Sequence, residues 1–148
     1  MIKTIRSSLI GVFHYNEELN NYEHEEGKIH WTLDCNNIEE ILKIAEQVYI
    51  NLGELDRNAK KAIATELIQY KNEFWPEYDE NDESLVWDAV DAGEFDTKIE
   101  EFEEVITLSH INIKISVIYC EYNDGGLFGG HRIHAYFDND FKLVKANI

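Results

Sequence analysis

Hydrophobic residues repeat with one period at the two ends of this 148-residue chain and with another period in its middle. Residues 29–33 and 113–117 alternate between apolar and polar side chains, as half-buried strands do. The apolar residues within 38–52 instead fall three or four positions apart, which is typical of an amphipathic helix. Strands followed by helices and then by strands predict a segregated α+β fold rather than an alternating α/β fold.

The strand pattern predicts an antiparallel sheet that combines an N-terminal meander with C-terminal strands. The expected strands cover residues 9–15, 19–23, 29–33, 105–111, 114–122, 131–137 and 142–148. Asn123-Asp124-Gly125-Gly126 is a strong turn signal between two of them. The order in which the strands pair does not follow from this pattern.

A central block of about four helices is expected to pack on one face of that sheet. The expected helices cover residues 38–52, 56–75, 84–92 and 97–104. Asn36 or Asn37 is the expected cap of the first helix, and Asp56 and Thr97 are the expected caps of the second and the fourth. Pro76 is expected to end the second helix, because proline forces the residue before it out of helical geometry.

Length and composition predict one domain over residues 1–148. The hydrophobic fraction of 44% excludes disorder over most of the chain, and no repeat or Gly/Ser/Pro linker divides it. We find neither an apolar run of membrane-spanning length nor a signal-peptide pattern, and therefore expect a soluble, cytoplasmic protein. Cys35 and Cys120 lie outside any C-x-x-C pair, so two reduced, buried thiols are expected rather than a zinc knuckle or a disulfide.

Charge is the feature that bears most on function. The chain has 30 Asp and Glu against 13 Lys and Arg, for a formal net charge of −17. This balance argues against a nucleic-acid partner and against anionic membranes, since both require clustered basic residues. Residues 73–104 hold 14 Asp and Glu but one Lys, so they carry −13 of that charge.

The same acidic stretch is interspersed with aromatic residues, and we interpret it as a surface for a basic protein partner. A negative field steers the encounter, and exposed aromatic side chains supply desolvated contact area. The candidate partner-binding residues are Trp75, Tyr78, Asp79, Glu80, Asp82, Glu83, Trp87 and Asp91. The alternative interpretation is that these helices are merely amphipathic, with aromatic residues in the core and acids in water. This alternative is favoured for Trp87 and Phe102.

Motifs for catalysis, metals and cofactors are weak, and we expect no catalytic residue, no metal site and no cofactor. Gly125 and Gly130 have phosphate-loop spacing, but His131 and Arg132 occupy the positions of the required Lys and Ser or Thr. The six histidines show no metal-binding spacing. His131 beside Asp124 or Glu121 forms a conceivable acid–base pair, although fixing the Gly-rich turn is the preferred role for His131.

Several short segments resemble a bacterial family of domains of unknown function. They are Gly11-Val12-Phe13, Trp31, Lys71-Asn72-Glu73-Phe74-Trp75 and the closing run from Asp124 to Ile133, which ends in Gly-His and a β-branched strand. The resemblance covers about residues 9–148 and implies a bacterial source and one intact domain, without an activity. Its motif residues of unknown role are Asn72, Asp124, Gly130 and His131.

Three functions are weighed on these observations. The first is a non-enzymatic, acidic protein-binding domain, most concretely an immunity-type inhibitor of a basic toxin or nuclease. The analogy with immunity proteins rests on small size, acidic charge and an α+β fold, and no sequence motif supports it. The second is a housekeeping interaction protein without an inhibitory role. The third, and least favoured, is a small enzyme that uses His131.

Overall fold

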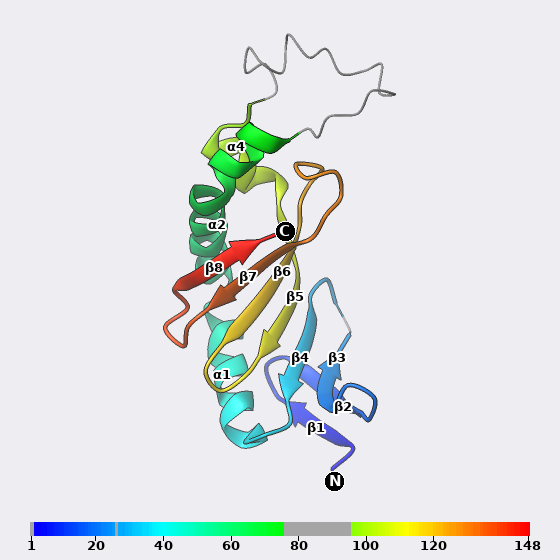
Figure 1. Cartoon of the computed structure of the whole chain (residues 1–148). Coiled ribbons are helices and arrows are strands. Elements are labelled where there is room, and N and C mark those ends of the chain that lie inside the picture. The colour runs from blue at the N-terminus through cyan, green and yellow to red at the C-terminus, as the bar shows by residue number, and fades with distance from the viewer. Residues whose placement is uncertain (1, 26, 76–95) are drawn as a thin grey trace.

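The computed structural model describes residues 2–25, 27–75 and 96–148. Its strands form one eight-stranded sheet in which they follow one another in chain order (Figure 1). The strands are β1 (Thr4–Ser7), β2 (Gly11–Asn16), β3 (Asn21–His24), β4 (His30–Asp34), β5 (Thr107–Ile113), β6 (Ile118–Asn123), β7 (Ile133–Phe137) and β8 (Leu143–Asn147). The N-terminal meander thus has one strand more than the three expected, because β1 adds to its edge.

The sheet is antiparallel throughout except at its centre. Neighbouring strands pair antiparallel on both sides, as expected, but β4 and β5 are parallel, with His30 opposite His110. The connection from β4 to β5 carries the helices, and a crossover of this length lets the chain return in the same direction. The expectation of a purely antiparallel sheet is therefore wrong at this one junction.

The described residues contain three helices where about four were expected. They are α1 (Ile38–Ile50), α2 (Leu52–Phe74) and α4 (Ile99–Val105), and the expected helix over residues 84–92 lies outside the described residues. Trp75 is extended after α2, as expected for a residue before proline.

The expected helix caps are not observed as capping side chains. Asn37 precedes α1 in a left-handed conformation and makes no side-chain cap bond. Asp56 lies within α2, which already begins at Leu52. Thr97 is not the cap of α4, because the helix begins after Lys98 and the Thr97 amide is bound by another side chain.

The core lies between the helices and one face of the sheet (Figure 1). Alternate strand residues such as Leu33, Ile111 and Ile113 are fully buried, as are Ile41 of α1 and Ile63 of α2. Burying each such side chain contributes about 1.5–3 kcal/mol relative to leaving it exposed. The alternation that fills the core leaves the intervening strand residues on the other face of the sheet.

Tyr122 is a polar anchor in this core that ties the sheet to α2. The Tyr122 hydroxyl donates to Asp56 Oδ1 at 2.6 Å. Burial, followed by the charge of Asp56 and this hydrogen bond, raises the pKa of Tyr122 far above its ordinary value. The phenol therefore stays neutral and donates to the carboxylate throughout the physiological range.

Candidate functional site

The acidic residues that flank the undescribed segment 76–95 meet at one end of the molecule. Asn72 near the end of α2 joins the two flanks: its Nδ2 donates to the Thr97 carbonyl oxygen at 3.1 Å, and the Thr97 amide donates to Asn72 Oδ1 at 2.7 Å. The side-chain amide of Asn72 thus pairs with the Thr97 backbone as a second peptide group would, through one donor and one acceptor. The described chain on either side of residues 76–95 is therefore tied together at this contact.

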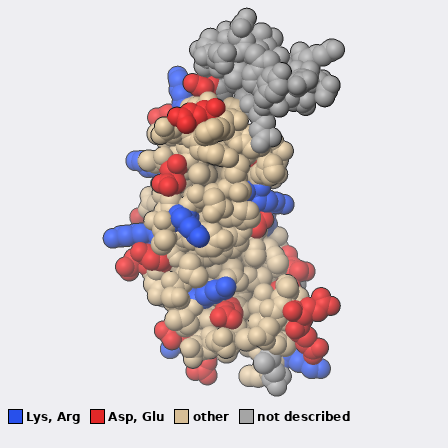
Figure 2. Space-filling model, viewed as in Figure 1, with Lys and Arg blue, Asp and Glu red and all other residues tan. Residues whose placement is uncertain are grey.

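We define the acidic end as the exposed Glu73, Asp96, Glu100, Glu101 and Glu104. Figure 2 shows acidic side chains next to the residues drawn in grey, with a basic side chain beside them, and a second group of acidic side chains towards the opposite end of that view. Phe102 is fully buried and anchors α4 to the core, as the amphipathic alternative expects for this residue. The positions of Glu100, Glu101 and Glu104 are thus fixed by a packed helix.

A buried cation lies close to the acidic end. Lys71 is only 5% exposed, and burial lowers its pKa, while the charges of Asp96 and Glu101 act in the opposite direction. Lysine is rarely buried unless its charge is compensated. The nearby carboxylates therefore also stabilise the fold at this end.

Asp124 organises the loop that follows β6. The Asp124 side chain is buried, and its carboxylate accepts amide hydrogens from Gly126 at 3.0 Å and from Phe128 and Gly130, each at 2.9 Å. Gly130 has a φ of 90°, a conformation that side chains strongly disfavour. Two of the four family-motif residues are thereby explained as parts of one closed loop.

Trp75 is buried against this loop, which corrects the expectation of an exposed aromatic anchor. Its ring meets Phe128 edge-on at 5.8 Å and His131 at 5.6 Å between centroids, and only 9% of the residue is exposed. The glycines make this possible, since a Cβ on Gly129 would lie 3.1 Å from the Trp75 ring. Trp75 therefore offers the acidic end little contact area for a partner.

His131 lies at the end of the same loop, and its side chain is exposed. Its amide donates to the Phe128 carbonyl oxygen at 3.4 Å, and its ring packs on Trp75. Asp124, Gly130 and His131 thus belong to the loop that packs on Trp75, whereas Asn72 binds the Thr97 backbone. The remaining candidate residues lie outside the described residues: Tyr78, Asp79, Glu80, Asp82, Glu83, Trp87 and Asp91.

A second polar region covers the face of the sheet that points away from the core. Strand register aligns its side chains in two rows that cross the sheet. One row is His30, His110, Glu121, His134 and Asn147; the other is His14, Glu23, Thr32, Asn112, Tyr119, Tyr136 and Lys145. We call these residues the polar sheet face.

Hydrogen bonds and ring contacts link the members of the polar sheet face. Asn112 Nδ2 donates to Thr32 Oγ1 at 2.6 Å, and Thr32 Oγ1 lies 2.9 Å from His110 Nε2. Further along, the Tyr119 hydroxyl donates to Glu121 Oε2 at 2.9 Å and also contacts His134 Nδ1. The network holds these rings in fixed orientations.

Two ionisable groups of this face are shifted towards their neutral forms. Burial, and then the neighbouring His30, lowers the pKa of His110. Burial, and then the hydrogen bond to Glu121, raises the pKa of Tyr119. A neutral imidazole can bind a cation without first releasing a proton, whereas the raised pKa keeps the Tyr119 phenol a hydrogen-bond donor.

Sequence reasoning missed the polar sheet face. The usable signal was the two-residue period within each strand, which places His110 with Asn112, Tyr119 with Glu121 and His134 with Tyr136. The rows also depend on which strands are neighbours, and the sequence alone does not give that order.

Fold and site together define an α+β domain with a helix-covered eight-stranded sheet, an acidic end and a polar sheet face. The chain belongs to the DUF2262 family, described as an uncharacterised protein conserved in bacteria, whose model matches residues 7–148. The expected resemblance to a bacterial family of unknown function is thereby confirmed. No curated protein and no solved structure matches the chain.

Among the described residues, none of the helices has the length and apolar character needed to cross a membrane. This finding agrees with the sequence, in which no apolar run of that length occurs.

Proposed function

We propose that this protein is a non-enzymatic binding domain that captures a basic protein partner at its acidic end, most concretely as an immunity-type inhibitor of a basic toxin or nuclease. The observation that carries the proposal is the hydrogen-bonded pair of Asn72 and Thr97. This pair gathers exposed carboxylates from both sides of residues 76–95 at one place. That segment itself contains eight Asp and Glu and no Lys or Arg.

Electrostatics explains how such a surface works. Each exposed ion pair contributes only about 0.2–1 kcal/mol. A dense group of like charges nevertheless steers an oppositely charged protein and raises its association rate, in a way that salt suppresses. A toxin or nuclease that grips phosphate has a basic surface, and an acidic domain seated on it blocks that surface.

Trp75 does not support the proposal, because it packs in the core of the loop. The proposal therefore rests on the carboxylates, and the contact residues expected within 78–91 remain predictions. The contacts of His131 with Trp75 and Phe128 favour its role in the loop over a role in an enzyme.

The test is a pull-down from the native bacterium with the full chain as bait, at low and at high salt. We expect a basic protein that is retained only at low salt. With the purified partner, the combined Asp79→Asn, Glu80→Gln, Asp82→Asn and Glu83→Gln variant should bind much more weakly; unchanged affinity removes the proposal. Stoichiometric loss of the partner's activity distinguishes an inhibitor from a housekeeping interaction protein.

A further inference from the structure

A carboxylate pair and an imidazole converge at one end of the polar sheet face. Glu23, Glu25 and His30 come from the β3–β4 hairpin, and their ligand atoms all lie within 4.8 Å of one another. The pairing of Glu23 with Thr32 sets this arrangement, because residues two apart on each strand share a face. The three side chains are thus adjacent although the chain turns between them.

The imidazole of His30 has an unused ligand atom directed at this group. His30 Nε2 is buried and has no hydrogen-bond partner among the residues that the structure describes. The nearest carboxylate oxygen among the described residues, Glu25 Oε1, lies 3.8 Å away, which is too far for a hydrogen bond. A buried nitrogen left in this state is costly unless a further group completes it.

Neighbouring residues hold the ligands in place. Asn16 Nδ2 donates to Glu23 Oε1 at 3.3 Å, and the His30 ring stacks on His110 with centroids 4.8 Å apart. His110 is in turn fixed by Thr32. Supporting contacts of this kind orient metal ligands and tune their affinity.

We propose that Glu23, Glu25 and His30 bind a divalent transition-metal ion of the zinc class. One imidazole nitrogen and two carboxylate oxygens are ligands that zinc accepts at about 2.0–2.2 Å. The two negative charges offset the charge of the ion, and the imidazole favours zinc over magnesium, which prefers oxygen ligands alone. Glu25 is exposed, so solvent can reach the ion and complete its coordination.

This site is separate from the acidic end and shares no residue with it. The main competing explanation is diffuse attraction of cations to a chain with a net charge of −17. A matched pair of variants separates the two explanations. Glu23→Gln with Glu25→Gln removes two charges from the site, and Glu17→Gln with Glu18→Gln removes two exposed charges from the neighbouring β2–β3 turn.

The experiment is calorimetric titration of the full chain, freed of metal by chelation, with zinc chloride at physiological salt. We expect one saturable site in the wild type. Removing an outer-shell partner usually costs 10–100-fold in metal affinity, so loss of both carboxylates, or His30→Gln, should weaken zinc at least about 100-fold. The Glu17→Gln, Glu18→Gln variant should stay within about threefold of wild type, since salt screens exposed charges.

Two further measurements test the site, one on the single variant Glu25→Gln and one on the NMR signals of His30. Because Glu25 is exposed, Glu25→Gln alone should fold normally and still lose affinity, whatever happens to His30→Gln. In NMR spectra, the His30 imidazole signals should shift and saturate at one equivalent of zinc. Equal losses in the two double variants, or unchanged His30 signals at saturation, would overturn the proposal.

Discussion

The side chain of Asn72 and the backbone of Thr97 form a reciprocal pair of hydrogen bonds across 25 residues of sequence. One bond uses the amide group of Asn72 as donor and the other uses its oxygen as acceptor, so only an asparagine or glutamine side chain can make both. The pair ties the end of α2 to the segment that leads into α4. The acidic end depends on this contact for its shape.

We predict that Asn72→Ala destabilises the protein by about 1–3 kcal/mol, because both Thr97 backbone groups lose their partner. Urea unfolding measures the change. Asn58→Ala is the matched control, since Asn58 is exposed on the same helix and its replacement should change stability by less than about 0.5 kcal/mol. Equal effects of the two variants would show that the Asn72 contact is not specific.

We predict that Asp124→Ala lowers the stability of the protein more than Asn123→Ala, which removes an exposed turn contact. The variant leaves the amides of Gly126, Phe128 and Gly130 without their common acceptor, and we expect a loss of about 3 kcal/mol or more. Asn123→Ala is the control, since the exposed Asn123 accepts only the Gly125 amide. Thermal unfolding of both variants checks the prediction, and a smaller effect for Asp124→Ala than for Asn123→Ala would contradict it.

The raised pKa of Tyr122 leads us to predict a loss of stability at alkaline pH. Burial raises the pKa of the Tyr122 phenol in the folded state above its value in the unfolded state. Its contribution is therefore complete below the ordinary tyrosine pKa of about 10 and is lost as the pH rises above it. In urea unfolding between about pH 8 and 11, Tyr122→Phe should show a shallower decline than wild type. Parallel declines would mean that Tyr122 does not titrate on unfolding.

The two free cysteines should differ in reactivity towards a thiol reagent. Cys120 is fully buried, and this burial raises the pKa of its thiol, whereas Cys35 is half-buried. The expectation of two buried thiols thus holds for Cys120 but not fully for Cys35. In native protein, DTNB should label Cys35 first, and Cys120 only after unfolding. Cys35→Ser identifies the signals, and rapid labelling of that variant would contradict the packing described for Cys120.

The sequence was informative wherever a local pattern determines the structure. The two-residue and helical periods located the later strands, α1 and α2, and Pro76 indicated where α2 ends. The strand β1 was missed, because Thr4–Ser7 contains one partly buried apolar residue, Ile5. Thr97 looked like a helix cap, but α4 begins one residue later, after Lys98.

Features that depend on contacts between distant segments could not be predicted. Trp75 beside Pro76 and a run of acids looked exposed, yet the loop organised by Asp124 packs Phe128 against it. The parallel pairing of β4 with β5 likewise aligns His30 with His110 across the sheet. Neither contact leaves a local signature, so both the polar sheet face and the buried tryptophan emerge only from the fold.

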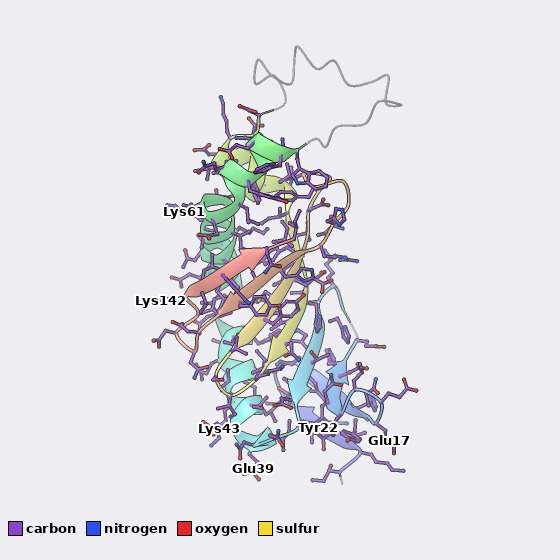
Figure 3. The ribbon with its side chains drawn as sticks, in the orientation of Figure 1. Glu17, Tyr22, Glu39, Lys43, Lys61 and Lys142 are labelled. Atoms are coloured by element: carbon purple, nitrogen blue, oxygen red, sulfur yellow. The ribbon has the colours of Figure 1, made fainter. Side chains whose placement is uncertain are left out.

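The most direct test of the account compares two charge variants that differ only in place. Glu100→Gln with Glu104→Gln neutralises two α4 carboxylates of the acidic end and leaves Glu101 to compensate Lys71; Glu17→Gln with Glu39→Gln neutralises two exposed carboxylates elsewhere. Glu17 and Glu39 lie at the end of the molecule opposite α4 (Figure 3). Both variants change the net charge equally, so any difference in binding between them comes from where the charges lie and not from the total charge.

The measurement is the affinity of each variant for the basic partner recovered at low salt, as a function of salt. At about 0.2–1 kcal/mol for each exposed pair, loss of the two α4 carboxylates should weaken binding about tenfold and flatten the salt dependence. The distal variant should bind within about twofold of wild type, because its charges lie beyond the screening length. Equal weakening by both variants, or none by the α4 variant, would contradict binding at the acidic end.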